Sequence, residues 1–267
     1  MSLPITTRNL ADHRRPLLWW VLGLVSYAAM ILAVYPSLKN QPGMAEIAKS
    51  YPKALLALFG MDAESFDLAQ ASTFLNTYLF SAIVPLIYVI FGASRGAAAV
   101  AGPEESGVLD LVLAYPVRRR SYVLQQALAV LVELVVIGFV LWLTVVVGGR
   151  LVGLDVDVAR LTTATLALAL LGGTFAGVAL VVGCATGSKG LADGVAAGIG
   201  VASYLVATLS GIATWLEPAR YASAFWYATD GAMTKGVPVG HLAVLVLADL
   251  VLVAVAVVVF ERRDLAG

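Results

Sequence analysis

The sequence predicts an all-α membrane protein with six transmembrane helices. Of its 267 residues, 60% are hydrophobic and only 13% are charged, and the mean hydropathy is +0.91. A soluble domain carries about 25% charged residues, so this deficit indicates an integral membrane protein. Six apolar runs lie near the roughly 20 residues that a helix needs to cross a bilayer. The expected spans, which form a single transmembrane domain over residues 1–267, are 17–35, 73–91, 122–147, 161–182, 191–215 and 241–260.

Positively charged residues orient these spans. Six spans return the C-terminus to the side of the N-terminus, and arginines flank the spans on that side at 14–15, 118–120 and 262–263. Because cytoplasmic loops carry an excess of such residues, both termini are expected to be cytoplasmic. The polar segment 1–16 would then anchor at the inner surface. The outer segments 36–72 and 216–240 are expected to contain helices that lie at the membrane interface.

Composition also excludes several classes of function. A net charge of zero gives no general attraction to nucleic acid. The single cysteine, Cys184, excludes an intrachain disulfide and a cysteine-based metal cage. Gly92 to Gly96 matches a serine-nucleophile pattern, but Ser94 and the candidate base His241 are expected at opposite membrane faces, roughly 30 Å apart. The segment Gly183 to Gly190 lacks the residue order of a phosphate loop. No catalytic, cofactor, metal or nucleotide site is therefore expected in this chain.

The longest polar interruption on the predicted cytoplasmic side is residues 102–120. It opens with a Gly-Pro break and two carboxylates, which suit the start of a helix. Val108 to Tyr115 can form two turns of amphipathic helix, which Pro116 ends. The apolar face would consist of Leu109, Val112 and Leu113. One interpretation is a docking helix for a cytoplasmic partner, and the alternative is an ordinary loop with basic residues at the membrane surface.

Two carboxyl groups fall near the middle of spans. Glu133 lies in the third span, with Gln126 on the same stripe, and Asp249 lies in the sixth. A carboxyl group in hydrocarbon costs a few kcal/mol, so each should face protein or water. No lysine or arginine is expected within a span to pair with them. They either line a translocation pathway that meets a cation or polar group, or form interhelical hydrogen bonds worth about 1 kcal/mol each. For each residue taken singly, the interhelical hydrogen bond is the preferred interpretation.

Small residues recur on one face of two spans. Gly190, Gly194 and Gly198 repeat every four residues at the start of the fifth span, and Gly173 and Gly177 do so in the fourth. Because small residues let membrane helices approach closely, these glycines are expected to pack the fourth span against the fifth.

Three segments resemble a known family, the permease subunits of type-two class ATP-binding-cassette (ABC) exporters. Residues 104–119 are similar to its coupling segment, E-x-G-x-L-[DE]-x-L-x-[AS]-x-P-[VI]-x-R. Tyr51-Pro52 through Gly60, a predicted outer helix, and the ending Phe260-Glu261-Arg262-Arg263-Asp264-Leu265 also resemble the family. An extra residue separates the acidic pair from Gly107, so either Glu104 or Glu105 can take the family role.

The resemblance implies an ATP-driven exporter in which this chain is not itself the enzyme. Two permeases, identical or homologous, would bind two cytoplasmic ABC ATPase subunits, and those subunits would bind ATP and Mg. The complex would lie in a bacterial plasma membrane. The coupling residues would be Glu104, Glu105, Leu109, Val112, Leu113, Tyr115, Pro116 and Arg118.

Two other functions compete with the exporter as interpretations of the sequence. The first is an ion- or proton-coupled carrier that works alone through Glu133 and Asp249. It is disfavoured because the sequence shows no internal repeat and no sign of broken helices. The second is a membrane enzyme, for which histidine, cysteine and lysine residues are too few on one side of the membrane.

Overall fold

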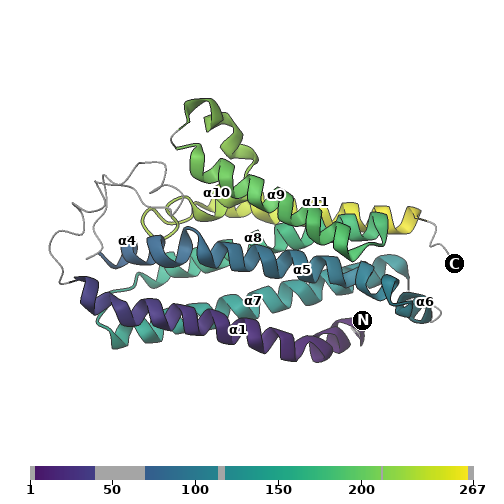
Figure 1. Cartoon of the computed structure of the whole chain (residues 1–267), viewed down its shortest axis with the longest axis horizontal. Helices are drawn as coiled ribbons and strands as arrows, with labels where there is room; N and C mark the ends of the chain where they lie inside the picture. Colours follow the sequence, from purple (N-terminus) through teal and green to yellow (C-terminus); the bar gives the residue numbers. More distant parts are fainter. Residues whose placement is uncertain (1–3, 40–69, 114–117, 212, 264–267) are drawn as a thin grey trace.

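The computed structural model describes residues 4–39, 70–113, 118–211 and 213–263, drawn in colour in Figure 1. In these ranges every regular element is helical. Six helices are long and apolar enough to cross a membrane, at 14–38, 71–105, 119–151, 158–186, 189–209 and 239–262. The prediction of an all-α protein with six spans is therefore confirmed.

The elements run in the following order. They are α1 (Pro4–Lys39), α4 (Ala71–Leu75), the π-helix η1 (Asn76–Phe80), α5 (Ile83–Glu105), α6 (Val108–Leu113), α7 (Arg119–Leu151), α8 (Val158–Thr186), α9 (Lys189–Leu209), the 3-10 helix η2 (Thr214–Ala222), α10 (Ala224–Thr229) and α11 (Val239–Arg262).

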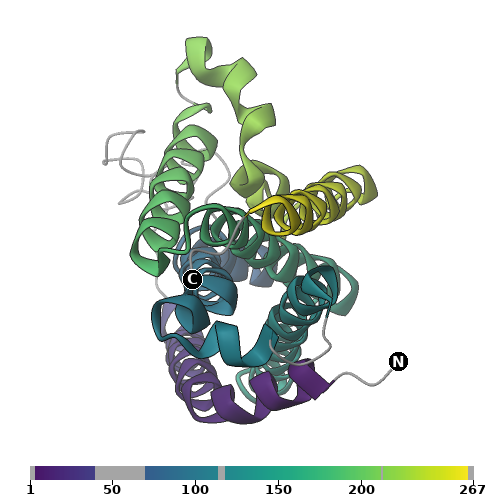
Figure 2. The ribbon, with the colours of Figure 1, turned by 90° about the vertical axis from the view of Figure 1, so that its right-hand side faces the viewer.

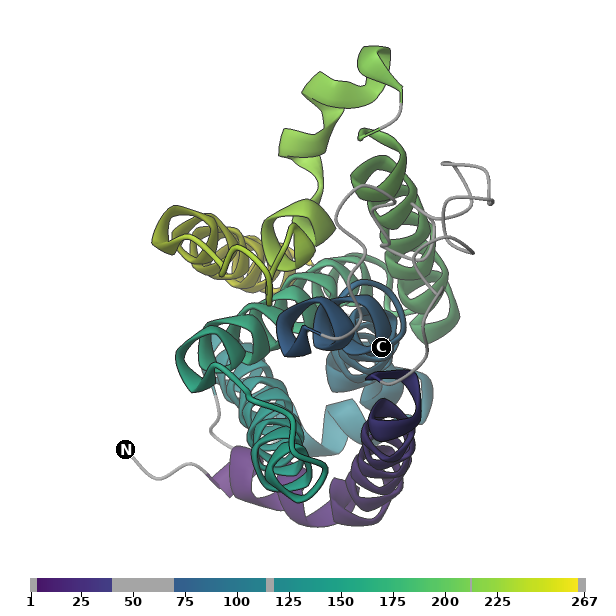
Figure 3. The same ribbon diagram turned by 90° about the vertical axis from the view of Figure 1, so that its left-hand side faces the viewer.

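Helix α8 is the centre of the bundle. It contacts α5, α7, α9 and α11, while α1 packs mainly on α7. Seen from the two ends of the bundle, α1 and α7 form one side, α9 and α11 form the opposite side, and α5 and α8 lie between them (Figures 2 and 3). Leu168, Leu171 and Phe175 of α8 are buried among the surrounding helices. A helix that is apolar on all sides is expected in this central position.

Glycines bring α5 and α8 into backbone contact. A Cβ atom added at Gly92 would collide with the carbonyl oxygen of Gly172, and one added at Gly96 would collide with that of Ala176. No larger residue fits at either position without moving the helices apart. The first and last glycines of the serine-nucleophile pattern are therefore packing residues.

The two largest differences from the predicted span boundaries are at the ends of the second and fifth spans. Helix α5 continues to Glu105, so the second span extends past its predicted end at residue 91 and includes the start of the polar segment 102–120. The residues from Gly92 to Ala101 are mostly small and apolar, and they stay helical because they pack on α8 and α7. The fifth span ends at Leu209, earlier than residue 215, and the 3-10 helix η2 follows it.

The second span is also broken, contrary to the expectation that the chain lacks broken helices. It begins as α4, passes through η1 and a turn at Ser81–Ala82, and resumes as α5. The Ser81 hydroxyl donates a hydrogen bond to the carbonyl oxygen of Thr77 across the break. The side-chain oxygen of Asn76 accepts a hydrogen bond from the Met233 amide, 3.1 Å away. The break thus connects the second span to the segment that follows α10.

Helix α10 and the segment that follows it fold back into the bundle between α9 and α11. Phe225, Ala228 and Met233 are buried in the same core as α8. The hydroxyl of Ser223 caps α10 by accepting a hydrogen bond from the Trp226 amide, and it also donates to the carbonyl oxygen of Ser203. The part of the predicted outer segment 216–240 that runs from Ser223 to Val237 therefore enters the bundle, whereas Tyr221 of η2 is 55% exposed.

Helix α1 begins and α11 ends at one end of the bundle, where α6 also lies (Figure 1). We call this the α6 end. An even number of spans requires this arrangement of the two ends. Which side of the membrane the α6 end faces stays a prediction. The predicted outer helix at Tyr51 to Gly60 lies outside the described residues.

Candidate functional site

A tight turn connects α5 to α6. The amide of Gly107 donates a hydrogen bond to the carbonyl oxygen of Glu104, and the Ser106 hydroxyl donates to that of Gly102. Gly107 has a φ of 70°, a conformation that glycine adopts without strain. Helix α6 starts at Val108, as predicted from the sequence. Tyr115 and Pro116, which were predicted to end the coupling helix, lie outside the described residues.

The exposed face of α6 differs from the predicted one. Leu109 is only 1% exposed and belongs to a buried cluster with Tyr122 and Phe260. Val108 is 46% exposed and Leu111 is 68% exposed. The expectation that Leu109 lies on an exposed docking face is therefore wrong, because α6 lies against the end of the bundle and the pattern alone did not show which side would be covered. The side chains of Val112 and Leu113 lie outside the described ones.

Glu104 and Arg263 form an ion pair at the α6 end. The Arg263 guanidinium donates hydrogen bonds to both carboxylate oxygens of Glu104, and a third to the carbonyl oxygen of Cys184 at 3.2 Å. Arg119, at the start of α7, donates to the carbonyl oxygen of Arg263 at 2.7 Å. These contacts connect the ends of α5, α7, α8 and α11. Arg118, the arginine predicted to take part, is exposed.

Glu105 has a separate partner. Its Oε1 atom accepts a hydrogen bond from the Lys189 amide at 2.7 Å, at the start of α9. A carboxylate is favourable there because the first amides of a helix lack partners within it and carry partial positive charge. The two glutamates whose roles the sequence left open are thus both used, Glu104 toward α11 and Glu105 toward α9. Glu104, Glu105, Arg119, Arg263 and the Lys189 amide form what we call the basal network.

Within the bundle, Glu133 forms an ion pair with Arg95. Arg95 Nε donates to Glu133 Oε2 at 2.6 Å, and Nη2 donates to Oε1 at 2.9 Å. Both side chains are almost completely buried. The expectation that no basic residue within a span could pair with Glu133 is wrong, because α5 remains helical past Phe91 and carries Arg95 into the bundle. Paired hydrogen bonds offset much of the cost of burying both charges.

Gln126 lies buried on the same helix. Its side-chain amide donates to the Tyr122 hydroxyl at 3.0 Å, and that hydroxyl donates to the carbonyl oxygen of Ala99 at 3.3 Å. Polar contacts between α7 and α5 thus occur both at Tyr122 and at Glu133. The same two helices are also connected at the α6 end, where Arg263 contacts both Glu104 of α5 and Arg119 of α7.

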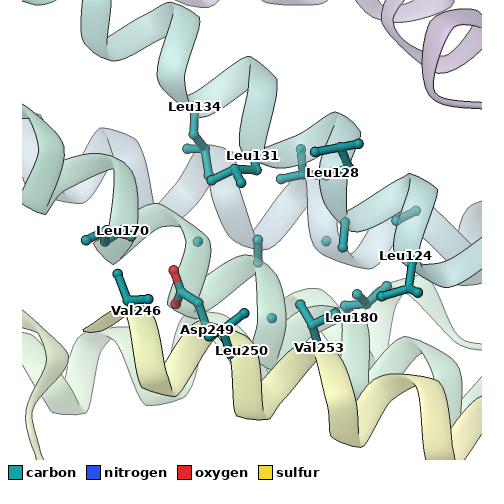
Figure 4. A pocket seen from close by; sticks show the side chains of 17 residues that line it. Leu124, Leu128, Leu131, Leu134, Leu170, Leu180, Val246, Asp249, Leu250 and Val253 are labelled. Carbon is teal, nitrogen blue, oxygen red and sulfur yellow. The ribbon is translucent and has the colours of Figure 1, made fainter. Parts of the chain in front are cut away.

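Asp249 lies elsewhere, in a groove between α7 and α11 whose floor is formed by α8 and α5. Figure 4 shows its carboxylate directed from α11 into the groove. The Thr174 hydroxyl of α8 donates a hydrogen bond to Asp249 Oδ1 at 2.7 Å. Glu133 is absent from the lining of this groove. A carrier that uses both carboxyl groups on one path would require them to line the same groove. The structure does not bring them together in this way.

The glycines predicted to pack the fourth span against the fifth do not do so. A Cβ atom at Gly173 would meet the Asp249 carboxylate, and one at Gly177 would meet Leu252, so both glycines face α11. Glycines 190, 194 and 198 have open space where a side chain would extend. The glycine of α9 that does contact neighbouring helices is Gly200, which faces Val89 and Phe175. The small-residue pattern showed which faces allow close packing but could not show which helix packs there.

Sequence reasoning assigned no role to several participants in these contacts, among them Arg95, Arg119, Thr174 and Arg263. Arg95 could have been found from length, because the apolar run continues with few polar residues to Ala101, past the predicted end of the span at Phe91. Arg119 and Thr174 carried no such signal. Arginine clusters are common beside spans, and threonine is common within membrane helices.

The comparison with protein families agrees with this architecture. The model of the ABC-2 family transporter proteins matches residues 3–265, nearly the whole chain. The chain therefore belongs to the ABC-2 transporter family and is a multi-pass membrane component of a transporter. No match was found among curated proteins.

Proposed function

We propose that this chain is the permease subunit of an ATP-driven exporter, in which two permeases work with two cytoplasmic ATPase subunits. The observation that carries the proposal is the position of α6. It is a short helix with Val108 and Leu111 exposed, next to a turn that Glu104 and Glu105 connect to other helices. Family membership supports the partnership with an ATPase. The bacterial plasma membrane and the outward direction of transport are part of the same proposal.

The basal network supplies a mechanical link from α6 to the spans. An ATPase bound to Val108 and Leu111 would move α6 when ATP draws the two ATPases together. Helix α5 would move with it, because only the turn at Ser106–Gly107 separates the two helices. The ion pair between Glu104 and Arg263 then carries the displacement to α11, and Glu105 carries it to α9. A short rigid lever is effective because a packed bundle shifts between discrete arrangements.

The second permease would lie on the open side of α9. Val195 and Ile199 are exposed there, next to the glycines at 194 and 198 that face open space. Such a surface of small and apolar residues suits close contact between two membrane helices. The copies would be identical in a homodimer or homologous in a heterodimer.

Purification of the tagged chain from its native cells in mild detergent tests the proposal. We expect a soluble ATPase with a G-x-x-x-x-G-K-[ST] loop to co-purify in stoichiometric amount. The double variant Val108→Asp/Leu111→Asp should reduce the recovered ATPase at least tenfold without reducing membrane insertion. Leu151→Asp is the matched control, because Leu151 is exposed at the opposite end of the bundle. Full recovery of the ATPase with the double variant would refute docking at α6.

A further inference from the structure

We propose that the groove between α7 and α11 binds a compact hydrophobic amine, whose ammonium group pairs with the Asp249 carboxylate. This inference rests on the proposed function, since it names the substrate class that the permease would carry.

The groove has the size of a small-molecule site. Its volume is about 390 Å³, within the range of roughly 300–1,000 Å³ that is typical of ligand pockets. Its rims are exposed side chains, chiefly Leu128 and Leu131 on α7 and Leu250 on α11. Because these rims belong to membrane-spanning helices, the opening faces lipid, and an apolar molecule dissolved in the bilayer can enter sideways. Figure 4 shows the leucines of α7 opposite Asp249.

The lining combines an apolar wall with one acidic group. Of its 17 residues, Asp249 is the only one that is not a leucine, valine, alanine or glycine. Such a wall favours hydrocarbon, and the half-buried carboxylate at its centre repels anions. A neutral apolar molecule would leave the carboxylate in a poorly solvating environment, which costs a few kcal/mol. An amine with an apolar body satisfies both parts of the lining.

The hydrogen bonding of Asp249 leaves room for that ammonium group. Among the described residues, the hydrogen-bond donor to Asp249 is the Thr174 hydroxyl, which takes up one acceptor position on Oδ1. An ionised carboxylate has about four such positions, and an ammonium supplies up to three donors. Glu133 shows the contrast, because two donors of Arg95 already occupy both of its oxygens. Of the two carboxyl groups near the middle of spans, Asp249 is the one placed to pair with a ligand cation.

The position of Gly173 supports the same assignment. A Cβ atom there would collide with Asp249 Oδ2, so glycine at this position lets the carboxylate lie against α8. The carboxylate is thereby held on the floor of the groove, under the apolar rims of α7 and α11. A ligand that enters between the rims would reach the charge with its polar end and contact leucines with its body.

Binding to the complete chain in lipid nanodiscs, without ATP, tests the proposal. The probe is tritiated 1-aminoadamantane, a compact cage amine that is protonated at neutral pH, and its uncharged analogue is 1-adamantanol. Empty nanodiscs of the same lipid give the partitioning to be subtracted. We expect saturable binding of the amine, and binding of the alcohol at least tenfold weaker. Asp249→Asn should weaken amine binding at least tenfold, and Leu128→Trp should do the same by filling the groove.

Matched controls are available for both variants. Asp193→Asn removes an acidic group that is paired with Lys189 near the start of α9, and it should leave binding unchanged. Leu143→Trp adds the same ring to α7 at a leucine of similar exposure, 43% against 38% for Leu128, outside the groove. If Leu128→Trp lowers the yield of folded protein, Asp249→Asn, which is nearly isosteric, still decides the question.

Several results would overturn the proposal. They are the absence of saturable amine binding to the unaltered chain, equal binding to Asp249→Asn, or equal binding of the alcohol. A disulfide between two copies that carry Leu128→Cys and Leu250→Cys, with Cys184→Ala, would also overturn it by showing that a second copy covers the groove. Co-purification of the ATPase is measured separately. If the ATPase co-purifies but the amine does not bind, this inference alone is refuted. If the amine binds but no ATPase co-purifies from native cells, the proposed function is refuted.

Discussion

Arg263 Nη1 lies 3.1 Å from Glu104 Oε2, and Nη2 bonds the other carboxylate oxygen, across 159 residues of sequence. The pair joins Glu104, the next-to-last residue of α5, to Arg263, the residue that follows α11. Both side chains are about one-fifth exposed, so solvent screens the pair less than it would a surface ion pair. This contact is where the coupling-like segment and the C-terminal ending, two parts of the sequence that resembled the same family, meet in space.

We expect Arg263→Ala to lower ATP-driven transport several-fold while the chain still inserts and binds its ATPase. The reason is that α6 keeps its exposed face, whereas the link from α5 to α11 is lost. Transport into inverted vesicles and ATPase recovery from the same preparation measure the two effects separately. Arg262→Ala is the control, because Arg262 is the preceding residue and its side chain is exposed. Unchanged transport in Arg263→Ala would contradict the role of the basal network.

A double variant separates the ion pair from other effects of Arg263. Glu104→Gln and Arg263→Gln should each weaken the contact, and the double variant should be less impaired than the sum of the two single variants. A coupling free energy on the order of 1–2 kcal/mol is expected for hydrogen bonds to charged groups that are largely shielded from water. The shifts in apparent Tm of the three variants in detergent, converted into free energies of unfolding, give this coupling free energy. Strict additivity of the single variants would show that the two side chains act independently.

The buried pair of Arg95 and Glu133 predicts a different response. Glu133→Gln leaves the Arg95 charge without a carboxylate in the bundle, and we expect destabilisation of roughly 3–5 kcal/mol. The double variant Arg95→Gln/Glu133→Gln removes both charges and should recover part of that loss. Thermal unfolding in detergent is the measurement. Asp249→Asn serves as the comparison and should shift the apparent Tm much less, because Asp249 lies in the open groove. Equal destabilisation by Glu133→Gln and Asp249→Asn would contradict the distinction drawn between the two carboxyl groups.

The sequence predicted the helical class, the number of spans and the start of α6, because hydropathy and glycine and proline positions carry that information directly. It did not predict the inward direction of Leu109 or the partner of Glu133. Both depend on which helix covers which face, and a single sequence does not encode that in local periodicity. Arg95 illustrates the difficulty, since one arginine among small residues is equally compatible with a loop and with a buried ion pair. The family resemblance supplied the coupling segment, but only the structure showed that Glu104 and Glu105 have separate partners.

Glycines within the spans should differ in how much their replacement by alanine lowers stability. Gly96→Ala places a methyl group against the carbonyl oxygen of Ala176, and we expect destabilisation of about 1–3 kcal/mol from overpacking. Gly198→Ala on α9 meets open space in a single copy and should leave the apparent Tm unchanged or slightly raised. Gly198→Leu should instead weaken association of two copies, measured by cross-linking in membranes. An equally large loss of stability from Gly198→Ala would show that this face of α9 is packed against the chain's own helices.

At the basal network, Gly187 is required both by the conformation of the backbone and by the lack of space for a side chain. It ends α8 with a φ of 66°, a left-handed conformation that disfavours residues with a Cβ atom. Its missing side chain also leaves space for the ion pair, since a Cβ atom there would contact both Glu104 and Arg263. We therefore expect Gly187→Ala to cost about 1–2 kcal/mol of stability through backbone strain and, in addition, to lower transport as Arg263→Ala does. Gly153→Ala is the matched control, because Gly153 has a φ of 68° but open space around it. The control should reproduce the loss of stability without the loss of transport, and equal transport in the two variants would show that Gly187 serves only the end of the helix.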